Sequence, residues 1–218
     1  MSGEARRPYD SRLRQARAAD TRARIIEAAQ QLFVERGYAG TTIPAIAGAA
    51  GVAVETVYRT ASGKAGLLGA AVRAAVAGGA ARADIPVSER PAVRRVIDEP
   101  DPVRQLQLYA ATQPGIWARV GPLLHVLDAA ATSEQSLLEL RDQIITERRQ
   151  GLRKLGRSLE RRGALRSGLT AQRAGDIVYA VCGHANYDAL VAQCGWSDRE
   201  YQDWVAETLV AALLPRPT

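Results

Sequence analysis

The sequence predicts an all-α protein with a small N-terminal domain and a larger helical remainder. Apolar residues recur at intervals of three and four along most of the 218 residues. Serine, threonine and aspartate stand at the starts of these runs and glycine or proline follows their ends, as expected for capped helices. No stretch of useful length alternates apolar and polar residues in the manner of a strand.

Composition and charge indicate a globular chain whose N-terminal end meets an anionic partner. At 47% hydrophobic residues the chain can bury a core in one domain of average size plus a smaller one. Its formal charge is +6, and the residues up to Lys64 carry ten basic against six acidic side chains. Most of the excess positive charge therefore lies at the end that we expect to face phosphates.

Several classes of protein are not indicated. No window approaches the roughly 20 apolar residues of a membrane span, and the arginine-rich N-terminus lacks the apolar core of a secretory signal, so we expect a cytoplasmic protein without a membrane partner. Cys182 and Cys194 are interpreted as buried reduced thiols; a redox switch needs an exposed thiol of low pKa, which nothing here indicates. Two cysteines and two histidines at irregular spacing do not match a zinc site, and no cofactor is predicted.

The first 20 residues are predicted to form a basic arm, flexible or partly helical. The arm either lies along DNA phosphates or in a minor groove, or is a solvated tail; its basic residues are Arg6, Arg7, Arg12, Arg14 and Arg17. From Thr21 an amphipathic pattern predicts the first helix, which Gly37 ends, and Phe33 is its expected core anchor.

The segment 41–64 is the most informative part of the chain. Its apolar positions predict one short helix over 43–50, with Thr42 as the N-cap and Gly51 as a left-handed turn residue. A second short helix is predicted to begin near Val54, with Val57 turned inward. Two short helices joined by such a turn form a helix-turn-helix, whose second helix lies in the major groove of DNA.

The outward residues of that second helix suit a DNA duplex. Thr56 and Arg59 can hydrogen-bond base edges, while Tyr58 can reach a phosphate oxygen. Lys64 adds a charge for phosphate at the start of the next helix.

Further helices are expected to follow. One spans 64–79, short pieces lie between Ala80 and Pro102, and Asp101 with Pro102 opens a helix towards Val120. A break at Gly121–Pro122 precedes a helix over 123–131, and a long helix over 135–162 ends at Gly163. Thr170 caps a single helix to about Gln193, and a capping box at 197–200 opens the last helix, which ends before Pro215.

About 50 residues of the N-terminal part resemble the DNA-binding domain of the tetracycline-repressor (TetR) family of transcriptional regulators. The residues that carry the resemblance are Ile25, Ile26, Ala28, Ala29, Leu32, Phe33, Gly37, Tyr38, Thr41, Thr42, Ile46, Ala47, Ala50, Gly51, Val52, Thr56, Val57, Tyr58, Arg59, Lys64, Leu67 and Leu68. Three positions depart from the family pattern. Pro44 replaces a frequent polar residue, Ala53 a frequent Ser or Thr cap, and Ala61 a frequent aromatic residue.

The resemblance implies an all-α homodimer with an N-terminal three-helix helix-turn-helix DNA-binding domain and a C-terminal helical ligand-binding and dimerisation domain. The domains expected are the arm (1–20), the helix-turn-helix domain (21–66) and the helical remainder (67–218). The residues expected to contact DNA, at bases or at phosphates, are those at the corresponding positions of the family pattern: Thr42, Val54, Glu55, Thr56, Tyr58, Arg59 and Lys64. The dimer is expected to form through the last two helices, at about 171–193 and 198–214.

A small-molecule pocket is expected among the helices between about 101 and 190. Its candidate lining consists of polar or aromatic residues that interrupt apolar faces, each with a core or surface role as the alternative: Tyr109, Gln113, Trp117, His125, Tyr179, His184 and Asn186. No pairing of His with Ser, Cys or acid at a recognisable spacing indicates an enzyme. The prediction is a ligand-responsive transcriptional repressor that binds a pseudo-palindromic operator as a homodimer and is released by a small-molecule effector. The alternative is a helical small-molecule-binding or interaction protein with a vestigial DNA-binding head.

Overall fold

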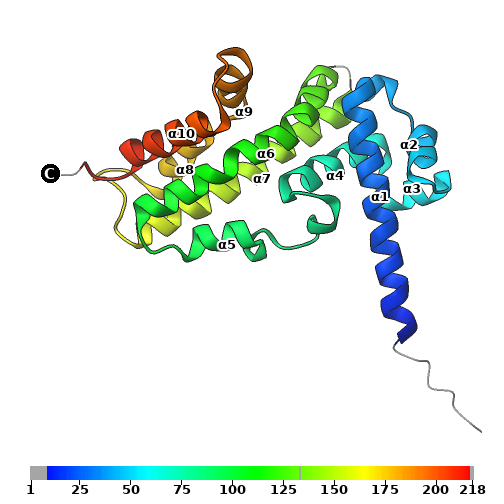
Figure 1. The fold of residues 1–218 in the computed structure, drawn as a ribbon, viewed down its shortest axis with the longest axis horizontal. Coiled ribbons are helices and arrows are strands. Elements are labelled where there is room, and N and C mark those ends of the chain that lie inside the picture. Colours follow the sequence, from blue (N-terminus) through cyan, green and yellow to red (C-terminus); the bar gives the residue numbers. More distant parts are fainter. Residues whose placement is uncertain (1–8, 133, 217–218) are drawn as a thin grey trace, which may run out of the picture. The chain divides into compact units, whose positions relative to one another are not determined.

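The computed structural model describes residues 9–132 and 134–216, and every regular element within these ranges is a helix. The chain divides into two compact units, the head and the body (Figure 1). The head comprises residues up to Asp84 together with Leu123–Ala130, and the body comprises Ile85–Pro122 and the chain from Ala131 onward. The elements are α1 (Tyr9–Gly40), α2 (Ile43–Ala50), α3 (Val54–Thr60), α4 (Gly63–Ala77), η1 (Ala80–Arg82), η2 (Val87–Glu89), α5 (Pro91–Asp98), α6 (Pro102–Ala131), α7 (Gln135–Arg161), α8 (Ala171–Val181), α9 (His184–Tyr187), η3 (Asp188–Gln193) and α10 (Asp198–Leu213).

The head is built on α1, against which α2, α3, α4 and η1 pack (Figure 1). Residues 9–20 of the predicted arm are helical and form the first turns of α1, whereas residues 1–8 lie outside the described residues. Gly37, with φ of 68°, interrupts α1 where the sequence predicts its end. Phe33 is fully buried, as predicted, and its ring stacks on that of Tyr38.

The body consists of long helices packed side by side. α8 lies along α7, and α10 packs on α8. The two helices of the first pair approach closely at Gly156 of α7, where an added Cβ would lie 2.2 Å from the carbonyl oxygen of Ala171. The body core is mostly aliphatic, with fully buried Leu106, Leu137, Leu159, Val178, Tyr201, Val205 and Leu209.

The predicted helix caps are present. The Thr42 hydroxyl accepts from Ala45 N, Asp101 Oδ1 accepts from Val103 N, and Thr170 Oγ1 accepts from Arg173 N. At the start of α10 the side chains and backbone of Ser197 and Glu200 form the reciprocal capping box. The local sequence therefore fixes where these helices begin.

The predicted break at Gly121–Pro122 is wrong, because α6 is one helix of 30 residues with Pro114 and Pro122 inside it. Trp117, Val120 and Leu123 are all buried at the spacing of one helical face. Burial of this stripe outweighs the lost hydrogen bond and the crowding that each proline causes.

The single helix predicted over 170–193 is also wrong. α8 ends at Val181, Gly183 is extended (ψ 146°), and α9 is followed by the π-helical segment η3. The carbonyl groups freed at this break find side-chain donors: Asn186 Nδ2 donates to the oxygens of Ala180 and Val181, at 2.9 and 3.0 Å. Because these groups are satisfied locally, the chain can leave the helix there without orphaned carbonyls.

Two expectations from composition have separate outcomes. Cys182 is buried as predicted, but Cys194 is exposed, because it directly follows η3 at the start of the loop to α10. No helix in the described ranges is long and apolar enough to cross a membrane.

Candidate nucleic-acid interface and effector site

The helix-turn-helix has the geometry that the sequence predicts. Gly51 takes the left-handed conformation (φ 63°, ψ 41°), which allows its N–H to return to the last carbonyls of α2 and the chain to turn into α3. Arg24 of α1 donates from Nη1 to the carbonyl oxygen of Ala50 at 3.0 Å. A side chain from the first helix thus holds the turn that orients the second and third.

The outward face of α3 carries the residues predicted to contact bases. Val57 is 1% exposed and anchors the helix, whereas Tyr58 on the adjacent position is 59% exposed. Arg59 Nη2 donates to Thr56 Oγ1 at 3.1 Å, so these two side chains lie together on the surface. Glu55 is exposed as well, and Val54 at the first position of α3 is half-buried.

Thr41, which the sequence analysis did not single out for a structural role, fixes the corner between α1 and α2. Its side chain is fully buried, and its Oγ1 lies 3.0 Å from the oxygen of Leu32 and 2.8 Å from that of Gly37. The hydroxyl can donate to either of these carbonyls, which lie near the interruption of α1 at Gly37. The sequence signal for this role is the position of Thr41, a small β-branched hydroxyl residue directly before the N-cap Thr42.

Lys64 is positioned by the same corner. Its Nζ donates to the carbonyl oxygen of Tyr38 at 2.9 Å and lies 4.2 Å from the centre of the Tyr38 ring. The ammonium group therefore links the start of α4 to the end of α1. Its predicted contact with a phosphate remains a prediction.

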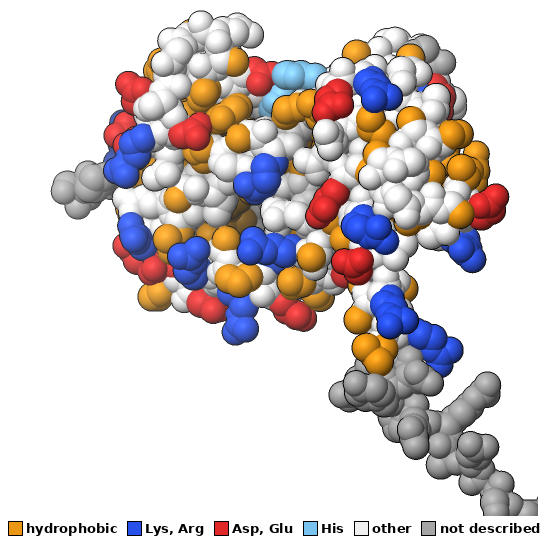
Figure 2. All heavy atoms as spheres, turned by 45° about the vertical axis from the view of Figure 1, so that its right-hand side comes forward, with side chains coloured by type: hydrophobic (Ala, Val, Ile, Leu, Met, Phe, Trp, Pro, Cys, Tyr) orange, Lys and Arg blue, Asp and Glu red, His pale blue; other side chains and the backbone are white. Residues whose placement is uncertain are grey.

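Basic side chains also follow the start of α1. Figure 2 shows arginine side chains on the part of this helix that projects from the head. Arg17 lies with Leu13 and Arg24 along a shallow groove on α1 of about 510 Å³. The described portion of the predicted arm thus presents positive charge on a helix rather than on an irregular tail.

Six of the seven predicted effector residues belong to the body, and His125 is an exposed residue of the head unit. Tyr109, Gln113 and Trp117 recur at every fourth position of α6, so they form one stripe on one face of the helix. Gln113 is buried with its Nε2 donating to Thr112 Oγ1 at 2.9 Å. This makes Gln113 a satisfied core residue.

Arg148 of α7 is the residue that the sequence analysis missed. Its guanidinium lies 4.9 Å from the centre of the Trp117 ring and 4.7 Å from that of Tyr179, and it donates to the carbonyl oxygen of Cys182. It thereby brings two predicted lining residues, from α6 and α8, to one point. On a helix with many arginines, only the three-dimensional packing distinguishes this one from its exposed neighbours.

Two phenols and a thiol surround this arginine. Burial raises the pKa of the Cys182 thiol to about 12, partly offset by the positive charge of Arg148 and a hydrogen bond with Tyr109. Burial likewise raises the pKa of Tyr109 and that of Tyr201, so both phenols stay protonated at neutral pH. The indole N–H of Trp117 lies close enough to the Tyr201 hydroxyl to lower its pKa slightly, yet neither group makes a hydrogen bond of ordinary geometry.

The other two predicted residues have structural partners. The His184 ring lies 5.4 Å from that of Trp117, and its Nε2 is 3.3 Å from an oxygen of Asp188. Asn186 is occupied with the end of α8, as described above. Of the predicted set, Tyr109, Trp117 and Tyr179 therefore surround the same point, and His184 borders it.

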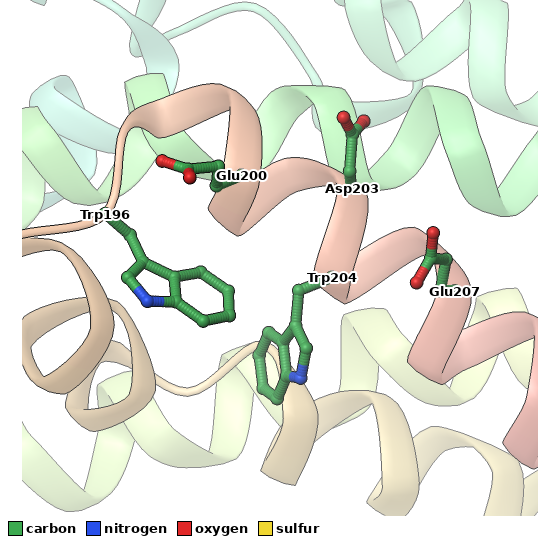
Figure 3. A pocket seen from close by; sticks show the side chains of 5 residues that line it. All are labelled: Trp196, Glu200, Asp203, Trp204 and Glu207. Atoms are coloured by element: carbon green, nitrogen blue, oxygen red, sulfur yellow. The ribbon is translucent and has the colours of Figure 1, made fainter. Parts of the chain in front are cut away.

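A separate groove of about 310 Å³ lies on α10. Trp196, from the segment before α10, and Trp204 both point into it, and Glu200, Asp203 and Glu207 complete its lining (Figure 3). Two of these carboxylates are already engaged: Glu200 in the capping box, and Asp203 with Arg199 Nε at 2.8 Å. The groove is open to solvent and shallow.

Comparison with known proteins identifies the head. Residues 25–71 match the family model described as bacterial regulatory proteins, tetR family. The head is a TetR-family DNA-binding domain. No curated protein matches the chain in sequence.

The whole chain has the all-helical fold of solved TetR-family regulators. It superimposes on the repressor NalD of Pseudomonas aeruginosa with a TM-score of 0.61 and 20% identity, covering 89% of this chain and 96% of that one. For FadR of Bacillus halodurans the TM-score is 0.66 at 17% identity, covering 95% and 97%. A protein from Mesorhizobium loti assigned to the TetR-family regulators gives 0.67 at 19% identity, covering 91% and 99%. At these identities the likeness concerns the fold.

The departures from the TetR pattern leave the head folded. Ala53 provides no side-chain hydrogen bond at the start of α3, yet the helix forms over its seven residues. Pro44 lies in the first turn of α2, where a missing N–H costs no helical hydrogen bond. Ala61 ends α3 with its N–H bonded to the carbonyl of Val57 at 3.4 Å.

Proposed function

We propose that this protein is a ligand-responsive transcriptional regulator that represses by binding a pseudo-palindromic operator as a homodimer. The observation that carries the proposal is α3, a short helix anchored by buried Val57 with Thr56, Tyr58 and Arg59 on its outer face, within a TetR-family head. A helix of this kind enters the major groove and reads base edges.

The division of roles on the head follows from side-chain chemistry. Arg59 is the base-reading residue, because a guanidinium can pair with the O6 and N7 atoms of guanine. Thr42 at the N-terminus of α2, Tyr58 and Lys64 are assigned to phosphates. In the free protein the Arg59–Thr56 hydrogen bond holds the guanidinium on the helix surface, from which it can exchange partners when DNA arrives.

Homodimerisation is proposed through the segments 171–193 and 198–214. Support comes from large apolar side chains that are only half-buried in the single chain, which a second copy would cover: Ile177, Val181, Leu190, Val191, Trp196 and Trp204. Two copies place two heads on half-sites separated by about one or more helical turns of DNA.

Release follows from linkage between effector and DNA. The dimer has one state whose two recognition helices match the operator and one whose helices do not. An effector that binds the second state more tightly lowers DNA affinity, and the loss equals the difference between its binding free energies for the two states. NalD is described as the secondary repressor of a multidrug efflux pump, and FadR as a fatty acid degradation regulator. These similarities support a regulatory role for this protein.

DNA binding by the full-length protein tests the proposal. We expect salt-dependent binding to the DNA upstream of its own gene and weaker binding to scrambled DNA of equal length. Arg59→Ala is expected to reduce the preference for the operator, and Lys64→Ala to weaken both DNAs alike; Arg157→Ala, at an exposed position of the body, is the matched control. Equal affinity of the unmodified protein for operator candidates and scrambled DNA would instead support a ligand-binding protein with a vestigial head.

A further inference from the structure

Two buried hydrogen-bond donors without a partner in the described part of the chain lie beside a guanidinium that has only one acceptor inside the body. The indole N–H of Trp117 and the hydroxyl of Tyr201 make no hydrogen bond among the described residues, although these residues are 5% and 0% exposed. The guanidinium of Arg148 faces the Trp117 ring and makes no ion pair within the described ranges. We call Trp117, Arg148 and Tyr201 the donor cluster; its members come from α6, α7 and α10.

Buried donors without partners are rare in well-packed proteins, because such groups lose their water and gain nothing in return. Two of them beside a guanidinium that makes one hydrogen bond and no ion pair among the described residues indicate a place prepared for an acceptor. The neighbouring polar groups do not supply it: the oxygen of Cys182 already receives one Arg148 N–H, and the Tyr109 hydroxyl pairs with the Cys182 thiol.

The charge and shape of the cluster select the acceptor. A guanidinium presents several N–H groups in a planar fork that matches the two oxygens of a carboxylate. The aromatic faces of Trp117 and Tyr179 beside it favour a ligand with an apolar or aromatic part next to that carboxylate. Arg148 and Tyr179 are both partly exposed, so a ligand can reach the guanidinium from solvent.

We propose that the donor cluster binds the carboxylate of a small organic acid, and that this acid is the class of effector to which the protein responds. The second half of this statement rests on the proposed regulatory function. The carboxylate accepts from the Arg148 guanidinium, the Trp117 indole and the Tyr201 hydroxyl, so the three donors are satisfied together.

Matched acids and amides test the proposal on the full-length protein. Benzoate, phenylacetate and hexanoate are titrated against benzamide, phenylacetamide and hexanamide, with tryptophan fluorescence and the thermal midpoint as readouts. We expect at least one acid to bind ten- to a hundredfold more tightly than its amide, roughly the ratio that a charge-assisted hydrogen bond supplies. Equal binding of acids and amides, or binding of neither, would overturn the proposal.

Variants locate the site. Arg148→Met is expected to remove the preference for the acid, whereas Arg157→Met, at an exposed position of the same helix, keeps it. Tyr201→Phe removes only the unpaired hydroxyl, so we expect acid affinity to fall several-fold while the thermal midpoint of the ligand-free protein does not fall. A lower midpoint with unchanged acid affinity would give Tyr201 a purely structural role and contradict the assignment, and this test remains valid if Arg148→Met does not fold.

DNA binding separates the two levels of the proposal. If the acid binds through Arg148 and lowers affinity for the operator, both the site and the regulatory role are supported. If the acid binds through Arg148 but leaves DNA affinity unchanged, the carboxylate site stands and its role as the effector site fails. If DNA is released by neutral compounds and not by acids, the regulatory function stands and the carboxylate site is wrong.

Discussion

Gly156 is the position at which the body is most sensitive to a single added methyl group. A Cβ built there lies 2.2 Å from the carbonyl oxygen of Ala171, 3.1 Å from its carbonyl carbon and 3.3 Å from Gly175 N. Carbon and oxygen atoms in proteins approach no closer than about 3.3 Å. Gly156→Ala therefore forces α7 and α8 apart by roughly 1 Å along this contact.

The expected loss follows from two opposing effects. Replacing glycine by alanine inside a helix gains about 1 kcal/mol from propensity. Overpacking against a backbone that cannot rotate away costs about 1–3 kcal/mol, occasionally more. Because the contact is with main-chain atoms of a second helix, we expect the overpacking to prevail and the thermal midpoint to fall by several degrees.

Gly151 of the same helix supplies the control. An added Cβ there meets no atom within 4 Å, so Gly151→Ala should gain the propensity without any clash. We expect it to raise the free energy of unfolding by about 0.5–1 kcal/mol. Urea and thermal unfolding followed by circular dichroism at 222 nm measure both variants. If Gly156→Ala is as stable as Gly151→Ala, the close approach of α7 and α8 is refuted.

Three further outcomes test individual contacts. A thiol reagent at pH 8 should modify Cys194 rapidly and Cys182 only on unfolding, because burial raises the Cys182 pKa to about 12 and keeps it a neutral thiol; fast modification of both would refute this. Asn186→Ala should lower the free energy of unfolding by about 1–3 kcal/mol by leaving two carbonyl groups at the end of α8 without donors, as urea unfolding can show. Thr42→Ala should cost about 1 kcal/mol through the lost cap of α2, and should weaken binding to operator and scrambled DNA alike. A selective loss at the operator would place Thr42 among the base-reading residues.

The head could be predicted closely because its determinants are local. Thr42 caps α2, Gly51 makes the left-handed turn, and Val57 is the buried residue of α3. Each of these roles can be predicted from neighbouring residues alone. The exposed set on α3 follows from the same periodicity. The resemblance to the TetR family then predicts that this face meets DNA.

The body was less predictable because its organisation depends on distant contacts. Pro122 reads as a helix breaker in sequence, yet burial along α6 carries the helix through it. α8 ends at Val181, where the side chains of Asn186 and Arg148 donate hydrogen bonds to the carbonyl oxygens of Val181 and Cys182. Neither donor is distinguishable by type from many other polar residues in the chain.

Arg148 illustrates the same limit for the candidate site. The stripe of Tyr109 and Trp117 on α6 could be found by counting residues, but the guanidinium that meets Trp117 belongs to another helix 31 positions away. Only packing separates it from exposed Arg149 beside it. Side chains that act across helices are therefore the part of the site that periodicity cannot supply.

DNA binding by a head variant and a matched body variant is the direct test of the proposed regulatory function. Fluorescence anisotropy with the DNA upstream of its own gene and with scrambled DNA, at two salt concentrations, compares the unmodified protein, Arg59→Ala and Arg157→Ala. Our prediction is that the unmodified protein binds the upstream DNA tightly and in preference to scrambled DNA, with affinity that falls as salt rises. Arg157→Ala retains this preference, and Arg59→Ala loses about 1–3 kcal/mol of it, the contribution of an arginine–guanine pair. Preference that is unchanged in Arg59→Ala, or absent from the unmodified protein, would contradict this prediction.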